Sequence, residues 1–190
     1  MTISPPVETA PGVRPPVVDE EILDISFLPT SNHTRTVVIA VDQSTNTDRT
    51  VQYALEKVIN RDTDLVVLVH VRPIIVPIYN FAKHDYSINM AEDHHKAGVA
   101  VVQKYGEIVT AAGALGTDEF KVRGLLLKGD PRDEVISRAE ALGADLIVVG
   151  SKGAGAFKRA VLGSVSDYII HHAHTAVLVV KPEHHKHEKH

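Results

Sequence analysis

The chain has 190 residues, of which 44% are hydrophobic and 23% are charged, and its formal net charge at pH 7 is −4. These values match one globular domain of ordinary size and exclude a wholly disordered, collagen-like or coiled-coil protein. The absence of cysteine excludes disulfides and thiolate metal sites, and the negative net charge makes nucleic acid and anionic membranes poor partners, so we expect neither.

The two ends of the chain differ in composition from its centre. Residues 1–33 are rich in proline, serine, threonine and acid, which predicts a disordered N-terminal tail. Its one short apolar group is Ile22, Leu23, Ile25, Phe27 and Leu28. Local docking of the stretch from Leu23 to Leu28 is left open. Residues 183–190 form a His-rich tail, interpreted as a solvated end, with transition-metal binding through imidazole as the alternative.

No apolar run approaches the roughly 20 residues of a membrane-spanning helix, and prolines interrupt the N-terminal region where a signal peptide would need an apolar segment. We therefore expect a cytoplasmic protein without a membrane partner, built on one folded domain at residues 34–182.

Within that domain, strand and helix patterns alternate. The first strand is predicted at Arg35 to Asp42, and the second at Leu65 to Val71. The helix between them would bury one stripe, made of Val51, Ala54, Leu55, Val58 and Ile59. After the second strand, the segment from Arg72 to Met90 is longer than a usual loop and is expected to lie over the edge where strands end. The second helical stripe is Val101, Tyr105, Ile108, Val109 and Ala112.

The second half of the domain repeats the pattern. Strands are predicted at Phe120 to Leu127, Asp145 to Gly150 and Ala176 to Lys181. The third helix opens with Asp130 as N-cap and Pro131 at its first position, and it closes at Gly143. The fourth runs from about Ser164 to His172 and is expected to turn Val165, Tyr168, Ile169 and His172 inward.

Apolar strands that alternate with helices predict βαβ units, hence an open, doubly wound, five-stranded parallel sheet with helices on both faces. Such sheets bind ligands beyond the carboxyl ends of their strands, where the strand order reverses.

A glycine-rich stretch follows the fourth strand and leads into the fourth helix. It reads Gly150-Ser-Lys-Gly153, then nine residues, then Gly163-Ser164-Val165-Ser166. Glycines admit a ligand close to the backbone, and the first turn of a helix presents unpaired N–H groups with a partial positive charge. This combination predicts an anion site, to which Ser164 and Ser166 would add hydroxyls and Lys152 a charge. The alternative is that the glycines serve only tight helix-to-sheet packing.

The spacing of this motif resembles the ATP-binding signature of the universal stress protein family. The resemblance covers about residues 34–182 and includes TVVIAVDQS, LVVLVHV, GDPRDEVISRAEALGADLIVVGSKG and LGSVSDYIIHHAHTAVLVVKP. It implies a Rossmann-like sheet of order 3-2-1-4-5, with an ATP, ADP or AMP pocket between the first and fourth strands and Mg²⁺ bound with the nucleotide. It also implies a homodimer that pairs the last strand, Ala176 to Lys181, with its copy.

The same resemblance assigns roles to particular residues. Asp42 and the backbone of Val71 would contact adenine, with Ala40 and Val41 lining the adenine pocket. Gly150 and Ser151 would border the ribose. The triphosphate cradle would be formed by Gly153, Gly163, Ser164, Val165 and Ser166. An acid after a first strand is often only a capping residue, so Asp42 owes its assignment to the glycine motif downstream.

Other polar residues suggest no further site. His70 lies within an apolar strand and is interpreted as a hydrogen-bonded core residue. His171, His172 and His174 suit the end of a helix dipole better than a zinc site. No nucleophile elbow, P-loop or G-x-G-x-x-G fingerprint is present, so we expect slow ATP hydrolysis at most.

Three functions follow from these observations: a nucleotide-dependent stress sensor or regulator, a slow ATP hydrolase on the same scaffold, or an interaction module with a vestigial pocket.

Overall fold

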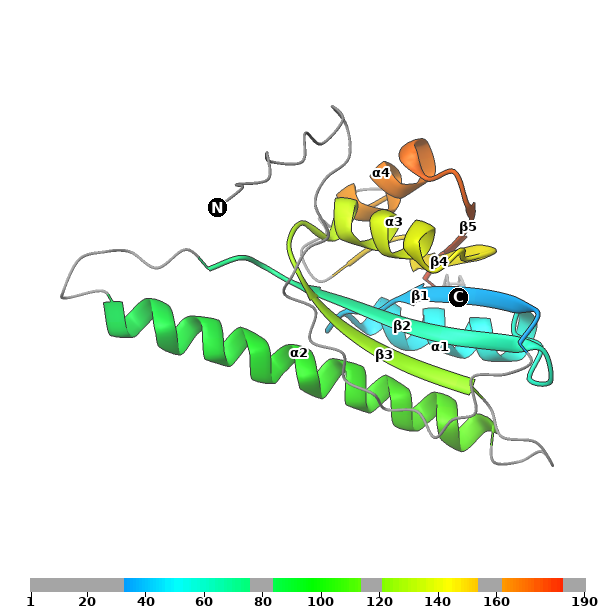
Figure 1. The fold of residues 1–190 in the computed structure, drawn as a ribbon, viewed down its shortest axis with the longest axis horizontal. Helices are drawn as coiled ribbons and strands as arrows, with labels where there is room; N and C mark the ends of the chain where they lie inside the picture. The colour runs from blue at the N-terminus through cyan, green and yellow to red at the C-terminus, as the bar shows by residue number, and fades with distance from the viewer. Residues whose placement is uncertain (1–32, 76–83, 114–120, 154–161, 183–190) are drawn as a thin grey trace, which may run out of the picture.

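The computed structural model describes residues 33–75, 84–113, 121–153 and 162–182, which form one sheet flanked by helices (Figure 1). The elements are β1 (Arg35–Ala40), α1 (Thr45–Lys57), β2 (Asp64–Arg72), α2 (His84–Gly113), β3 (Lys121–Lys128), α3 (Pro131–Ala141), β4 (Leu146–Gly150), α4 (Ser164–His172) and β5 (Ala176–Val180). The tails predicted at residues 1–33 and 183–190 lie outside the described residues, apart from His33. Among the described residues, no helix is both long and apolar enough to cross a bilayer.

The five strands are parallel and lie in the order β3-β2-β1-β4-β5, which confirms the predicted fold class. β1 occupies the centre of the sheet, where Ala40 is in register with Val69 of β2 and Ile39 with Val148 of β4. The carboxyl ends of β1, β2 and β4 therefore meet at one edge. The strand order reverses between β1 and β4, which places the crevice of a doubly wound sheet at that edge.

Two apolar layers hold the helices on the sheet. Side chains alternate across it, so that Val37 and Ile39 of β1 face one layer, while Val38 faces the other. The first layer packs α1 and α2 through residues such as Val51 and Tyr105, and the second packs α3 and α4. Figure 1 shows these helix pairs on opposite sides of the sheet. Because both faces are covered, the central residues of β1, β2 and β4 are apolar on both faces of the sheet.

Local sequence signals place the ends of α3 correctly. The Asp130 carboxylate accepts a hydrogen bond from the backbone N–H of Arg132 at 3.0 Å, and Pro131 occupies the first helical position. At the other end, Gly143 adopts φ 59°. Its N–H donates to the Glu140 carbonyl, and the Ala144 N–H donates to the Ala139 carbonyl. This pattern is the glycine-terminated helix end that the sequence predicts. α4 also spans the predicted range.

Three details of the expected helices are wrong. α2 begins at His84, inside the segment expected to be a loop, because the helix extends beyond the strands that it covers (Figure 1). Ile108, expected in the buried stripe, is 41% exposed because it borders a groove between α1 and α2. His172 is exposed, since it stacks on Tyr168 at the surface with ring centroids 3.8 Å apart.

Candidate functional site

A pocket of about 520 Å³ opens where the strand order reverses. It is lined by the ends of β1, β2 and β4, by the glycine loop and by the first turns of α1, α3 and α4. Eleven of the predicted site residues line it: Ala40, Val41, Asp42, Val71, Gly150, Lys152, Gly153, Gly163, Ser164, Val165 and Ser166. The volume lies within the range of small-molecule sites. The fold thus brings the two separate stretches of the predicted site together.

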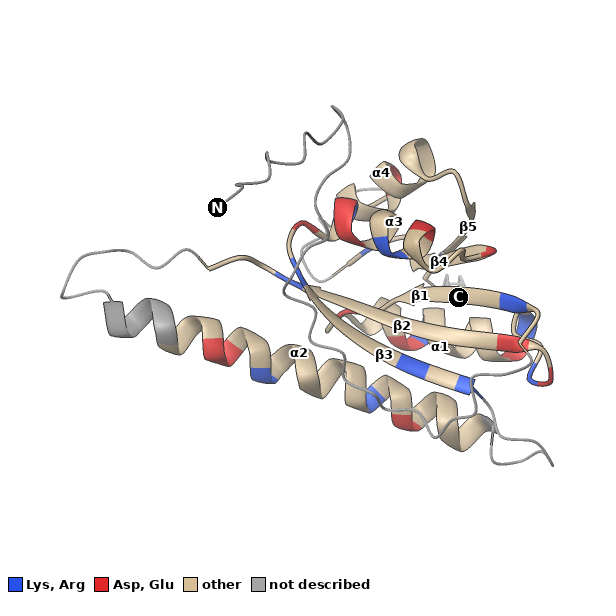
Figure 2. Cartoon of the chain, in the orientation of Figure 1, with Lys and Arg blue, Asp and Glu red and all other residues tan. Residues whose placement is uncertain are grey.

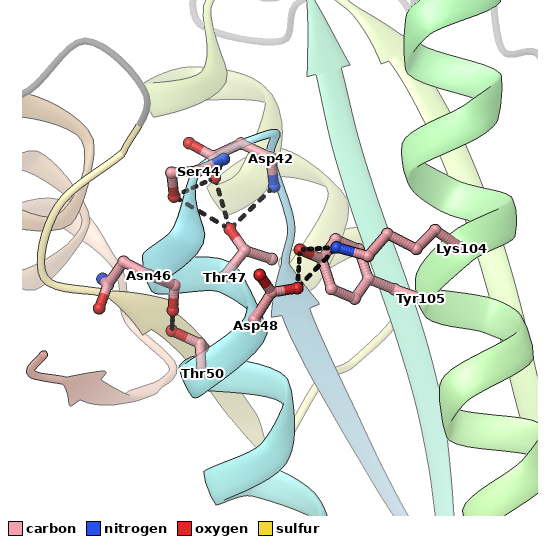
Figure 3. Close-up of polar contacts among 8 residues, drawn as sticks. All are labelled: Asp42, Ser44, Asn46, Thr47, Asp48, Thr50, Lys104 and Tyr105. Atoms are coloured by element: carbon pink, nitrogen blue, oxygen red, sulfur yellow. Dashed lines mark hydrogen bonds and ion pairs between the residues drawn. The ribbon is translucent and has the colours of Figure 1, made fainter. Parts of the chain in front are cut away.

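Asp42, just beyond β1, is held by groups at the start of α1 (Figure 3). Its Oδ1 accepts from the backbone N–H of Ser44 at 2.9 Å, from the Ser44 hydroxyl at 2.6 Å and from the Thr47 hydroxyl. The Thr47 Oγ1 in turn accepts from the Asp42 N–H at 3.2 Å. Thr47 is buried and also lines the pocket. These bonds restrict the carboxylate to one orientation, with Oδ1 toward α1.

The other carboxylate oxygen of Asp42 lies against the glycine loop. A Cβ atom built on Gly153 would lie 2.8 Å from Asp42 Oδ2, which is closer than real side chains approach. A Cβ atom on Gly150 would lie 2.5 Å from Asn46 Nδ2, and the Asn46 amide donates to the Lys152 carbonyl at 3.1 Å. Positive φ is not the reason for these glycines, because the described glycines with positive φ are Gly129 and Gly143. Gly150 and Gly153 are needed because Asp42 and Asn46 approach the glycine loop closely.

The first turn of α4 forms the opposite wall of the pocket. Gly163 is the N-cap, and no side chain caps the helix, so the first N–H groups of α4 are not covered by a capping side chain. Ser164 is exposed at this end. The Ser166 hydroxyl is buried and donates to the carbonyls of Gly163 at 3.0 Å and Ser151 at 3.2 Å, so it faces the protein backbone. Ser164 is therefore the serine whose hydroxyl is better placed for a ligand.

Ser151 is the one predicted site residue that does not line the pocket. It is fully buried, its N–H donates to the Val180 carbonyl of β5 at 2.8 Å, and its carbonyl accepts from Gly163 N–H at 2.7 Å. The residue thus joins the glycine loop to β5 and to the start of α4, behind the wall of the pocket. This placement suits a residue that shapes the loop rather than one that borders a ribose.

His70 lines the pocket although the sequence suggested only a core role. Its Nδ1 lies 2.8 Å from the Val41 carbonyl, which confirms the predicted hydrogen bond. Burial lowers the pKa of His70 below its ordinary 6.5, while the bond to Val41 and the charge of Asp42 act in the opposite direction. A neutral ring donates from Nδ1 to the carbonyl, so His70 fixes the end of β1. Gly98 of α2 leaves room for the ring.

Sequence reasoning missed further residues of this site. Asn46 and Thr47 lie at the start of α1, four and five positions after Asp42. The local signal for them is the run of polar residues at this helix start, whereas their burial is known only from the structure. Pro131 and Val135 come from α3, which packs over the crevice and adds apolar surface. Nothing local in the sequence indicates that α3 reaches this pocket, because its position depends on the packing of the second layer.

The pocket therefore has two chemical halves. The ends of β1 and β2 together with α3 supply apolar surface and Asp42, which suits a flat ring carrying hydrogen-bonding groups. The start of α4 and Lys152 supply N–H donors, the positive end of a helix dipole and a cation, which suit an anion. In the described part of the chain, no group of three His, Cys, Asp or Glu side chains has a metal-binding arrangement.

The charged residues outside the pocket have mixed signs. Figure 2 shows Lys and Arg interspersed with Asp and Glu along the described helices and at the strand ends.

Comparison with known proteins connects these features to one family. The family model described as the universal stress protein family matches residues 33–181. The chain is 28% identical over 151 residues to a putative universal stress protein of Staphylococcus haemolyticus, which covers 78% of this chain and 86% of that protein. It is 44% identical over 61 residues to universal stress protein MJ0531 of Methanocaldococcus jannaschii, covering 32% of this chain and 36% of the relative. The chain thus matches about a third of that relative's length.

Solved structures share the fold. The structure of the protein MJ0577 superposes with a TM-score of 0.63 at 24% identity, covering 79% of this chain and 97% of the other. An Arabidopsis thaliana universal stress protein family structure with AMP bound gives a TM-score of 0.57 at 22% identity, covering 78% and 92%. A universal stress protein in complex with cAMP gives 0.53 at 22%, covering 77% and 96%.

Proposed function

The chain belongs to the universal stress protein family, and on that premise we propose that it binds ATP or a related adenine nucleotide in the pocket between β1 and β4 and acts as a nucleotide-dependent regulator. The observation that carries the proposal is the convergence of two stretches distant in the chain: Asp42 with its α1 partners on one side, and Gly153 with the uncapped start of α4 on the other. Family structures with bound AMP and cAMP support it.

The chemistry of each half supports a binding mode. The adenine and ribose would occupy the apolar half beside Asp42 and Val71, and the phosphates would lie at Gly163 and Ser164. Mg²⁺ would enter with the nucleotide and take phosphate oxygens as ligands, because no group of protein ligands stands ready among the described residues. The lack of cysteine supports a cytoplasmic setting as part of this proposal.

A homodimer belongs to the same proposal. β5 pairs with β4 along one side, and in the described residues no strand pairs along its other side. The strand is short and apolar, and Ala176 is exposed while Val177, Leu178 and Val179 are half-buried. An unpaired apolar edge favours pairing with another strand, and a second copy would pair antiparallel across a twofold axis.

Equilibrium binding tests the nucleotide proposal. Calorimetric titration of the purified protein with ATP and Mg²⁺ should give saturable binding, and Gly153→Val should weaken it at least tenfold because its side chain would collide with Asp42. Gln103→Val, an exposed position on α2, is the matched control and should bind as the wild type does. Equal and weak binding by wild type and Gly153→Val at millimolar ATP would show that the proposal is wrong.

A further inference from the structure

A second hollow lies on the other side of the sheet from α3, between α1 and α2. This α1–α2 groove has a volume of about 250 Å³ and is lined by Asp48, Val51, Gln52, Leu55, Glu56, Arg61, Tyr105, Ile108 and Ala112. Its floor is apolar, and Ile108 is one of three large apolar side chains that are strongly exposed in the described part of the chain. The groove is separate from the nucleotide pocket, whose lining shares none of these residues.

The described chain enters the fold beside one end of this groove. The Thr34 N–H donates to the Thr63 carbonyl at 2.9 Å, and the Arg35 guanidinium donates to the Val58 carbonyl at 2.7 Å. Both acceptors lie in the loop between α1 and β2, and Arg61 of the same loop lines the groove. The residues that precede Thr34 therefore start next to the groove opening.

The sequence just upstream carries the large apolar residues noted above. Leu28 lies six residues before Thr34, a stretch that spans at most about 20 Å. From Ile22 to Leu28 an extended chain covers about 20 Å more, which is close to the length of the 13-residue helix α1 along which the groove runs. Residues 1–32 lie outside the described residues. Reach and apolar pattern make this segment a candidate occupant of the groove.

We propose that the apolar segment Ile22 to Leu28 docks in the α1–α2 groove, with Phe27 and Leu28 packed against Leu55 and Ile108. The tether favours this occupant over a separate partner, because a segment joined by six residues is present at a high effective concentration. The acidic residues beside the segment, such as Asp24, would remain at the solvent side, where Arg61 is the cation of the groove lining. This inference does not depend on nucleotide binding.

The absence of native cysteine makes disulfide trapping a clean test. In the full-length chain, Phe27→Cys with Ile108→Cys should form an intramolecular disulfide readily under mild oxidation at low protein concentration, because the two positions would lie within bonding distance. The matched control is Phe27→Cys with Glu140→Cys. Glu140 is exposed near the end of α3, on the opposite face, and that end also lies beside the chain entry, since the Asp145 N–H donates to Thr36 at 2.9 Å.

Mass spectrometry of the oxidised products decides the outcome. The groove pair should close at least tenfold faster than the control pair. Similar rates for the two pairs would overturn the proposal, and so would intermolecular disulfides from the groove pair, which would assign the groove to a second copy.

A second measurement uses a single substitution in the groove. Ile108→Cys should react with a soluble thiol reagent several-fold faster when Phe27→Asp is also present, because the polar side chain would leave the groove. Ile108 is already 41% exposed, so this variant is expected to fold, and circular dichroism checks that it does. Equal reactivity in the two backgrounds would also contradict docking.

Discussion

Thr47 acts on the pocket through Asp42. It is the buried residue that both donates to and accepts from Asp42, so it sets the direction of the carboxylate without any charge of its own. Thr47→Val removes the hydroxyl but keeps the shape, and we expect it to lower ATP affinity about tenfold, in line with ~1.5–3 kcal/mol for a hydrogen bond to a charged group. Thr47→Ser keeps the hydroxyl, so its ATP affinity should stay within about twofold of the wild-type value.

Titration calorimetry with two ligands separates positioning from general damage. Tripolyphosphate would use the start of α4 and lacks the parts that would lie near Asp42, so its affinity should not change in Thr47→Val. A parallel loss for ATP and tripolyphosphate would indicate that Thr47 only supports the structure.

His70 makes stability depend on pH. Its pKa is lowered in the folded protein by burial, whereas the unfolded chain has the ordinary value near 6.5. As pH falls through 6.5, the His70 side chain binds a proton in the unfolded state but not yet in the folded state. The free energy of unfolding is therefore unaffected by His70 above pH 6.5 and decreases below it. The slope from this one group is at most about 1.4 kcal/mol per pH unit.

His70→Asn is the matched variant for this prediction, because its amide keeps a donor near the Val41 carbonyl but does not titrate. Urea unfolding at pH 7, 6 and 5 should show a steeper loss for wild type than for His70→Asn. The other histidines are common to both proteins, so parallel pH curves would count against a role for His70.

At the scale of single elements, α3 depends on its cap. Asp130 accepts from Arg132 N–H and from the Arg132 side chain, which lowers the pKa of the Asp130 carboxyl to about 2. Asp130→Ala should reduce the free energy of unfolding by about 1 kcal/mol, whereas Asp130→Ser keeps a capping oxygen and should lose less. Urea denaturation measures the difference. Equal losses in the two variants would mean that the cap contributes little.

The whole molecule offers one test of assembly. If β5 pairs antiparallel with its copy, residues near the middle of the strand lie opposite themselves, and like charges placed there repel. Leu178→Lys should therefore shift the protein from dimer to monomer in sedimentation equilibrium, while Gln103→Lys on exposed α2 should leave the dimer intact. A monomeric wild type at micromolar concentration would contradict the dimer directly.

Much of the fold is predictable from sequence because its signals are local. Apolar β-branched runs predict the strands, Asp130 and Pro131 predict the start of α3, and Gly143 predicts its end; each depends on a residue and its near neighbours in the chain. α2 shows the limit of such reasoning. The segment from Arg72 to Met90 is predicted as a loop from its length and position, whereas α2 begins within it at His84 and extends beyond the strands that it covers.

For the pocket, the sequence by itself determined which backbone is free of side chains and where the uncapped helix begins, since both follow from the glycine spacing. Only the tertiary structure decided what those glycines face. Gly153 must be small because Asp42 lies against it, and Ser151 lies behind the wall because β5 accepts its N–H. The same holds for Thr47 and His70 in the lining, and for the exposure of Ile108. The physical reason is that backbone conformation depends on adjacent residues, whereas burial and side-chain contact depend on the packing of elements far apart in the chain.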